Sequence, residues 1–234
     1  MKIARTLSAL LIASSLGLYA SAANAVIIGD FNNFINEDLG TGLFDSGAPP
    51  GWVVVGNGVN GTVDSILTLP NNSYGISCYE GSGCVDLDGT SAGSGGAGIL
   101  RSAAPVVLAP NQDYQLSVWL SGTQRGTGNN SVLFGLSDAT GGPLPMLFQA
   151  TGDLGTGSAF TQYVLNIAAS PVPIAGAYVF LWNVLGNDQQ GPIADLVELT
   201  AVPLPAAVWL LLSGLLGLGA VARRRRGTTA AVPA

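Results

Sequence analysis

The residue types that carry out most enzyme chemistry are scarce in this sequence. It contains no histidine, and its one lysine, Lys2, lies at the start of the chain. A Ser-His-Asp triad, a histidine-bound zinc site and a lysine Schiff base are therefore excluded. Paired carboxylates could still cleave glycosidic bonds, but neither Asp86-x-Asp88 nor Asp195-x-x-Glu198 sets the separation that two catalytic acids need. The sequence predicts a protein that is not an enzyme, with a glycan-processing enzyme as the rival.

The charge distribution separates the middle of the chain from its two ends. Six of the 8 basic residues lie before residue 6 or after residue 222, whereas all 14 acidic residues lie between residues 26 and 202. This central segment therefore has 2 basic and 14 acidic residues, a net charge of −12. Such a surface repels phosphate backbones, so we expect no nucleic-acid partner. The acids suit hydration or divalent cations, and plain solubility is an alternative reason for them.

One tryptophan is placed where it could bind a sugar. In the expected strand 112–120 apolar residues alternate with others, and Trp119 falls on the face opposite the apolar one. Its indole ring could stack on a sugar ring while polar side chains of the following loop form hydrogen bonds. Packing of the ring under a loop is an equally good alternative. The candidate ligand-binding residues are Trp119, Gln124, Arg125 and Asn129.

The first 25 residues have the three parts of a secretory signal peptide. The segment starts with positive charge, continues with an apolar run over 7–18, and closes with the small residues Ala23 and Ala25. We therefore expect residues 1–25 to be removed by cleavage after Ala25, which predicts export. A retained membrane anchor is the alternative, although the apolar run is short for a spanning helix.

The other end of the chain has the pattern of a membrane-spanning segment that is followed by basic residues. Residues 204–222 form an apolar stretch of 19 residues, enough for a helix to cross a hydrocarbon core of about 30 Å. Four arginines follow, and basic residues stay on the cytoplasmic side of a membrane. We therefore expect the body of the protein outside the inner membrane and the short tail 227–234 in the cytoplasm.

The sequence Val-Pro-Leu-Pro-Ala at 202–206 is a short motif at the start of the apolar stretch, and the four arginines end that stretch. With these parts in this order, residues 202–226 resemble the PEP-CTERM class of sorting signals in its VPLPA variant. The resemblance implies that an exosortase, a membrane transpeptidase, cleaves near the short motif and releases or relocates the protein at the cell surface. The class is associated with Gram-negative bacteria that make exopolysaccharide, biofilm or floc. A simple single-span anchor is the alternative. The motif and cluster are Val202, Pro203, Leu204, Pro205, Ala206, Arg223, Arg224, Arg225 and Arg226.

Between the two ends, residues 26–201 are predicted to form one all-β domain. Apolar residues recur with period two, most clearly at 112–120 and 161–168, and glycine-rich turn signals separate such segments. This pattern favours an antiparallel two-sheet sandwich, a jelly roll, flanked by the signal-peptide helix and the transmembrane helix. The aromatic stripe of Tyr178, Phe180 and Trp182 is expected in its core. The other expected strands are 53–55, 62–69, 98–103, 132–137, 177–184 and 193–200.

Cys78 and Cys84 are the two cysteines of the chain. They flank a glycine-containing segment of five residues in an otherwise cysteine-free domain that is expected to be exported. A local disulfide that pins this loop is therefore predicted, with two free thiols as the alternative.

Short segments at 29–31, 50–52, 85–89, 110–117 and 193–199 follow one another along the body. In this order they resemble segments of galactose-binding-domain-like jelly rolls, a skeleton that surface carbohydrate-binding modules and the plant cell-wall DUF642 proteins share. It implies a structural calcium near the joined chain ends. Exposed turn carboxylates are the alternative. The implied calcium ligands are Asp30, Asp86, Asp88 and Asp195.

These features predict a cell-surface or extracellular-matrix protein that is anchored in the inner membrane until an exosortase processes it. Its expected role is to bind polysaccharide, such as exopolysaccharide, without catalysis. A structural coat component without a defined ligand is the main rival.

Overall fold

The computed structural model describes most of the predicted β domain and little of the two ends. The described residues are 25–29, 31, 44–45, 48–55, 64–67, 75–88, 97–126, 128, 130–185, 190–203 and 214–218. Residues 23–202 form one compact unit, and the terminal segments form another. In the terminal unit the structure describes Pro203 and a helical stretch over 214–218.

The expected features of the two ends lie mostly outside these residues. Ala23, the signal peptide before it, the motif from Leu204 to Ala206 and the four arginines are not among the described residues. In the part of the chain that the structure describes, no helix has the length and apolar character needed to span a membrane.

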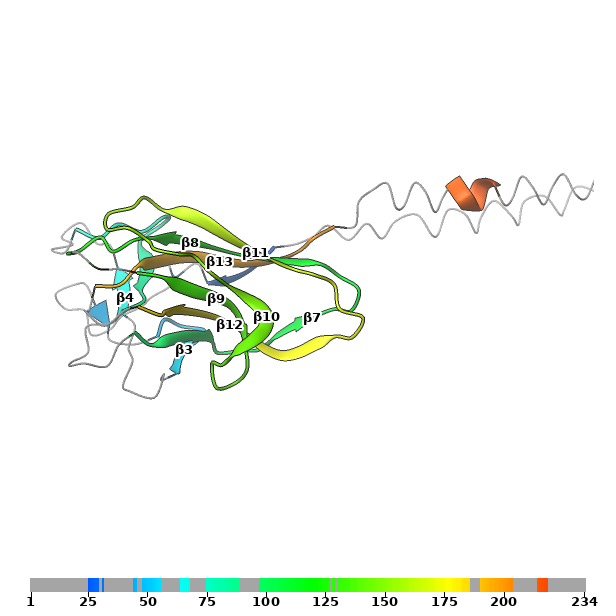
Figure 1. Cartoon of the computed structure of the whole chain (residues 1–234), viewed down its shortest axis with the longest axis horizontal. Coiled ribbons are helices and arrows are strands. Elements are labelled where there is room, and N and C mark those ends of the chain that lie inside the picture. Colours follow the sequence, from blue (N-terminus) through cyan, green and yellow to red (C-terminus); the bar gives the residue numbers. More distant parts are fainter. Residues whose placement is uncertain are drawn as a thin grey trace, which may run out of the picture. The chain divides into compact units, whose positions relative to one another are not determined.

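The described part of the compact unit is built from strands in two antiparallel sheets (Figure 1). This confirms the prediction of an all-β sandwich. Sheet A has the order β11 (Thr161–Ile167), β8 (Tyr114–Ser121), β13 (Ile193–Ala201), β5 (Gly83–Asp86), β4 (Asp64–Leu67) and β2 (Phe44–Asp45), with β1 (Ala25–Gly29) also paired to β13. Sheet B has the order β10 (Pro143–Ala150), β9 (Val132–Ser137), β12 (Ile174–Asn183), β6 (Ile99–Ser102) and β3 (Trp52–Val55), with β7 (Val106–Leu108) also paired to β12.

The core lies between the two sheets and follows the alternation of the strands. In β8, Leu116, Val118 and Leu120 are fully buried and pack against residues of sheet B such as Phe134 and Leu181. The residues between them in β8 therefore face away from the core. This places Trp119 on the outer face of sheet A, as its spacing predicts.

A bulge in β13 fixes which of its side chains reach that outer face. Ala194 belongs to the core, and so does Val197, although an unbroken alternation would send them to opposite faces. The register with β8 shifts between Asp195 and Val197, and the intervening Leu196 has a positive φ of 40°. The bulge therefore lets Asp195 face outward while the core contacts continue on both sides of it.

The aromatic stripe of β12 differs in part from its expected position. Ala177, Val179 and Leu181 belong to the core, so the stripe faces the outside of sheet B. Phe180 is fully buried as expected, but Tyr178 and Trp182 are only partly buried. Both faces of β12 are apolar, so alternation alone could not tell which face meets the other sheet.

Candidate functional site

The ring of Trp119 lies on the outer face of sheet A, but a second ring covers it. Its cross-strand neighbours are Gln162 on β11 and Asp195 on β13. The ring of Tyr79 stacks on it with centroids 3.8 Å apart and planes inclined by 12°. Of the two options that the sequence left open, the structure therefore shows the tryptophan packed under a loop.

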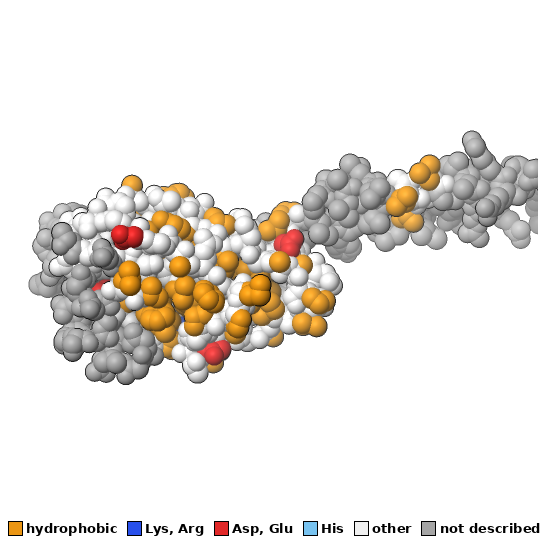
Figure 2. Space-filling model, in the orientation of Figure 1, with side chains coloured by type: hydrophobic (Ala, Val, Ile, Leu, Met, Phe, Trp, Pro, Cys, Tyr) orange, Lys and Arg blue, Asp and Glu red, His pale blue; other side chains and the backbone are white. Residues whose placement is uncertain are grey.

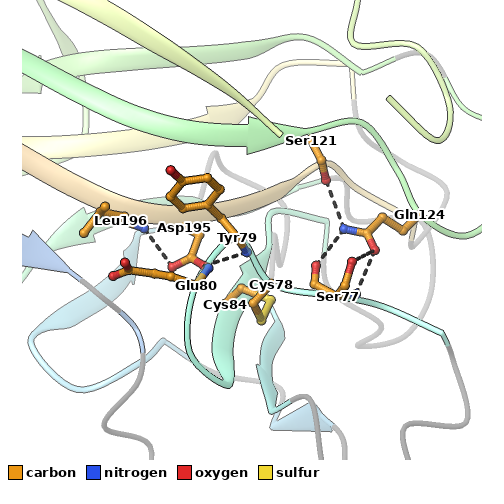
Figure 3. Close-up of a disulfide and its surroundings, with 9 residues drawn as sticks. All are labelled: Ser77, Cys78, Tyr79, Glu80, Cys84, Ser121, Gln124, Asp195 and Leu196. Atoms are coloured by element: carbon orange, nitrogen blue, oxygen red, sulfur yellow. Dashed lines mark hydrogen bonds between the residues drawn. A yellow bond between two sulfur atoms is a disulfide. The ribbon is translucent and has the colours of Figure 1, made fainter. Parts of the chain in front are cut away.

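The covering segment, residues 77–84, is called the disulfide loop below. Cys78 and Cys84 form the predicted disulfide, with 5.4 Å between their Cα atoms. The N–H groups of Tyr79 and Glu80 donate to Oδ2 of Asp195 at 2.9 and 3.1 Å (Figure 3). A covalent bridge and a carboxylate thus hold the part of the loop that carries Tyr79.

A second contact holds the start of the disulfide loop. The N–H and Oγ of Ser77 donate to Oε1 of Gln124 at 2.8 and 3.1 Å, and Nε2 of Gln124 donates to the carbonyl of Ser77 at 2.8 Å. The same amide nitrogen lies 3.2 Å from Oγ of Ser121. The sequence predicts that Gln124 contacts a ligand, whereas in the structure its side-chain amide is hydrogen-bonded to Ser77 of the loop.

Asp195 is fully buried beneath this loop. Burial raises the pKa of Asp195 from 3.8 to about 6, because the folded chain removes its carboxylate from water. Hydrogen bonds from the N–H groups of Glu80, Leu196 and Tyr79 lower the pKa and offset only part of that effect. The carboxyl group therefore changes its charge close to neutral pH, which an ordinary aspartate does not.

Three rings and one patch of apolar side chains complete the site. Phe160 lies 5.9 Å from the Tyr79 ring in a tilted arrangement. Tyr79, Trp119 and Phe160 are called the aromatic cluster below. Beneath the loop, Ile76, Cys84 and Ile193 form a small separate core against which Phe160 packs. Tyr79 is 40% exposed, so the cluster presents an aromatic surface that rests on a rigid base.

Arg125, which the sequence predicts to contact a ligand, pairs with an acid of the protein. Its Nη2 lies 2.6 Å from Oδ2 of Asp86, whose side chain is fully buried. The other oxygen of Asp86 accepts the N–H groups of Asp88 and Gly191, each at 2.9 Å. Arg125 therefore neutralises a buried carboxylate, and Asn129, the last predicted contact, lies outside the described residues.

Two of the predicted calcium ligands, Asp86 and Asp195, have different hydrogen-bonding partners among the described residues. Asp86 is engaged by Arg125, whereas Asp195 accepts hydrogen bonds from the disulfide loop. In the ranges that the structure describes, no three acidic, cysteine or histidine side chains are placed to hold a metal ion. Asp30 lies outside those ranges.

Sequence reasoning missed two members of the aromatic cluster, Tyr79 and Phe160, and the part that Asp195 plays. The available signals were an aromatic residue directly after Cys78 and an acid at an outward position of the otherwise apolar β13. Neither signal says that the two segments meet, because 116 residues separate Tyr79 from Asp195.

No family model and no curated protein matches this chain. Among solved structures, the Stig cyclase Fisc from Fischerella sp. TAU, in complex with an indole compound, is similar at a TM-score of 0.54 and 20% identity, over 77% of this chain and 99% of that one. A cyclase from Fischerella sp. TAU in complex with 4-(1H-indol-3-yl)butan-2-one has a TM-score of 0.54 and 19% identity, over 78% and 98% of the two chains.

A carbohydrate-active protein is also similar, at a lower score. The CBM22-1-GH10 modules of a Clostridium thermocellum xylanase, complexed with xylohexaose, have a TM-score of 0.38 and 15% identity, over 69% of this chain and 28% of that one. A likeness at this score carries no argument about function.

The cyclase comparison contradicts the prediction that the protein is not an enzyme. A similar fold covers 99% and 98% of two chains that are named as cyclases, so a domain of this fold can be an enzyme. The prediction relied on the absence of histidine from the sequence and on the position of its one lysine, Lys2, at the start of the chain. These facts exclude mechanisms that need a histidine or a lysine, but they do not exclude catalysis by carboxyl groups. At this identity the likeness shows a shared fold and leaves the reaction of this chain undefined.

Proposed function

We propose that this protein is exported to the cell surface or matrix and that its jelly-roll domain binds polysaccharide on the aromatic cluster. The observation that carries the proposal is the stacking of Tyr79 on Trp119 at an outward-facing position. An aromatic face of this kind takes the apolar side of a sugar ring, while neighbouring polar groups bind its hydroxyls. Gln162, which is exposed beside Trp119, supplies such a group.

The rigidity of the platform supports this role. Tyr79 is fixed by the disulfide, by the two loop amides that bind Asp195 and by the ring beneath it. A ring that is already ordered loses little conformational entropy when a ligand stacks on it. The outer face of sheet A continues as polar side chains, with Nε2 of Gln115 3.2 Å from Oδ1 of Asn166. A linear glycan could extend from the cluster along this face.

Replacing Tyr79 with alanine is expected to weaken polysaccharide binding by about tenfold or more, because the stacking surface is lost. The measurement is titration calorimetry of the full-length protein with exopolysaccharide from the native cells. Tyr79→Phe keeps the ring and is expected to bind like the wild type. Phe148→Ala, which removes a ring of equal exposure from sheet B, is the matched control. A flat titration of the wild type would reject the proposal in favour of a coat protein without a ligand.

The sorting tail supplies the route to the surface. β13 ends at Ala201, and Val202 is still bound to the sheet through its N–H to the Asp113 carbonyl and through its carbonyl from Nε2 of Gln112. Pro203, the next residue, is exposed. Cleavage after Val202 would leave every one of these hydrogen bonds intact, so processing need not disturb the domain.

Processing predicts a defined mass for the mature protein. Protein recovered from the cell surface is expected to end within residues 202–206 and to lack the arginines 223–226. Intact-mass spectrometry of cells with and without their exosortase measures this directly. An unchanged C-terminus in both strains would contradict the sorting proposal and indicate a simple anchor.

Proton transfer is a second candidate function, favoured by Asp195. A carboxyl group whose pKa is raised to about 6 can donate a proton near neutral pH, and a substrate would reach this one if the disulfide loop that covers it opened. The similar cyclases are complexed with indole compounds. Saturable binding of 4-(1H-indol-3-yl)butan-2-one, without polysaccharide binding, would favour this candidate over the first.

A further inference from the structure

One end of the sandwich exposes apolar side chains. The turn between β7 and β8, the turn between β11 and β12, and the end of β13 meet there. Segments 103–111 and 168–177, which contain these turns, have no charged residue. Val107 and Val172 are 68% and 63% exposed, and Val202 is 37% exposed. Figure 2 shows hydrophobic side chains over the end of the body where Figure 1 labels β7. The two segments and Val202 are called the apolar end below.

Hydrogen bonds join the two turns and the end of β13 into one surface. The N–H of Asn111 donates to the carbonyl of Ser170 at 2.7 Å. The N–H of Ala169 donates to Oδ1 of Asp113 at 2.7 Å, so the acid beside the first turn is bound to the second. The N–H of Val202 donates to the Asp113 carbonyl at 2.8 Å. The apolar end is therefore held together up to the last residue before Pro203.

The two turns have several backbone positions that leave no N–H group unpaired. Three of their residues are prolines, which have no N–H group: Pro110, Pro171 and Pro173. The N–H of Ala109 donates to the hydroxyl of Tyr114 at 2.9 Å. The N–H of Val172 donates to Oγ of Ser170 at 3.2 Å. An unpaired N–H group is costly to place in an apolar environment, so these pairings suit turns that contact lipid.

The number of residues between the domain and the sorting tail indicates what lies next to the apolar end. Val202 is still hydrogen-bonded to the domain, and the apolar stretch 204–222 begins two residues later. Two residues of extended chain reach about 7 Å. If this stretch crosses the inner membrane, as the sorting tail of the proposed function requires, the surface around Val202 lies at the lipid headgroups.

This short connection makes a weak contact sufficient. A few valine side chains bury too little apolar area to hold a free domain on a membrane. A tether of this length keeps the domain at a high effective concentration beside the lipid, so a weak apolar contact is populated. Attraction to anionic lipid would need basic side chains, which segments 103–111 and 168–177 do not contain.

We propose that the apolar end rests on the outer surface of the inner membrane, with its valine side chains among the lipid headgroups, until the tail is cleaved. The inference rests on the sorting tail of the proposed function. Tyr114 of β8 pairs with Ala201 at this end, and Trp119 lies five residues further along β8, about 17 Å away. The aromatic cluster therefore stays clear of the lipid, and cleavage of the tether releases the domain.

The test measures lipid contact at one introduced cysteine. Full-length protein is reconstituted in phosphatidylcholine vesicles that contain a lipid with a spin label near its headgroup. The native cysteines are paired in the disulfide, so the new cysteine alone takes a fluorescent dye. A dye at Val172→Cys is expected to lose most of its fluorescence to the spin label. Leu185→Cys, beyond the other end of β12, is the matched control and should lose none, because the ten residues of β12 span about 33 Å.

An added charge tests whether the contact is apolar. In the dye-labelled Val172→Cys protein, Val107→Asp is expected to abolish most of the quenching, because a carboxylate is costly to bring into lipid. Leu185→Asp, which adds the same charge at an exposed position of the opposite end, is expected to leave the quenching unchanged. Added phosphatidylglycerol is expected not to increase the quenching. Circular dichroism checks that each variant is folded, and the comparison of the two dye positions does not depend on the charged variants.

Flotation of the vesicles separates failure of this contact from failure of the sorting tail. Protein that does not float with the vesicles would contradict the membrane tail and the contact together. Protein that floats without quenching at Val172→Cys, or with equal quenching at both dye positions, would overturn the contact alone. Quenching that Val107→Asp leaves unchanged would show proximity without an apolar contact and would also overturn it. A disulfide between two Val172→Cys chains, without quenching by lipid, would indicate that a second copy covers this end.

Discussion

Replacing Arg125 with alanine is expected to lower the free energy of unfolding by about 3–5 kcal/mol. Asp86 is fully buried, and its Oδ2 lies 2.6 Å from Nη2 of Arg125. Without the arginine, Oδ1 of Asp86 still accepts hydrogen bonds from the N–H groups of Asp88 and Gly191, but the carboxylate loses the cation that pairs with Oδ2. A buried charge that loses its partner destabilises a fold far more than the intact pair stabilises it.

Urea denaturation of single and double variants measures this effect. Adding Asp86→Asn to Arg125→Ala is expected to restore part of the loss, because the orphaned charge is then absent. Arg101→Ala is the matched control, since it removes the other arginine of the domain without breaking a salt bridge, and about 1 kcal/mol or less is expected. A loss below about 1 kcal/mol for Arg125→Ala would show that Asp86 is not held as a buried ion.

Raising the pH from about 4 to 7 is expected to destabilise the wild type by about 2 kcal/mol relative to Asp195→Asn. Burial raises the pKa of Asp195 from 3.8 to about 6, so the folded state binds this proton more tightly than the unfolded state. The resulting stability is fully present below pH 3.8 and is lost as the pH rises through about 6. Water near the exposed disulfide loop partly solvates the carboxylate, so the change in the free energy of unfolding is smaller than the pKa shift alone would give.

The comparison isolates this one carboxyl group. All other acids titrate alike in both proteins, so the difference between their urea unfolding free energies across this pH range reports on Asp195. Asp153→Asn, which alters an exposed acid, is expected to follow the wild type. Parallel curves for the wild type and Asp195→Asn would show that the carboxyl group is not desolvated beneath the loop.

The position and facing of strands that alternate clearly could be predicted from the sequence, whereas one strand without such alternation was missed. β8 and β11 lie where period-two patterning places them, with Thr161 to Ile167 of β11 in unbroken register with β8. β10 was not expected, because its sequence has two prolines and a nearly continuous apolar run. It is tolerated because it is the edge strand of sheet B, where a missing N–H breaks no central ladder.

The candidate site was only half predictable for a similar reason. The outward position of Trp119 and the disulfide depend on spacing within one segment, and both are confirmed. Tyr79, whose ring covers Trp119, lies 40 residues before it in the sequence. Asp195, whose carboxylate holds the loop, lies 116 residues after Tyr79. Tertiary packing sets these contacts, as it sets the pairing of Arg125 with Asp86, and no local pattern encodes them.

An NMR titration tests whether the aromatic cluster binds polysaccharide. The full-length protein is titrated with oligosaccharide fragments of the exopolysaccharide while the indole N–H signals of its 4 tryptophans and the ring signals of Tyr79 are followed. If the cluster binds the glycan, the signals of Trp119 and Tyr79 are expected to shift together and saturate, while that of the buried Trp52 stays unchanged. Unchanged Trp119 and Tyr79 signals at saturating oligosaccharide would contradict binding at the cluster.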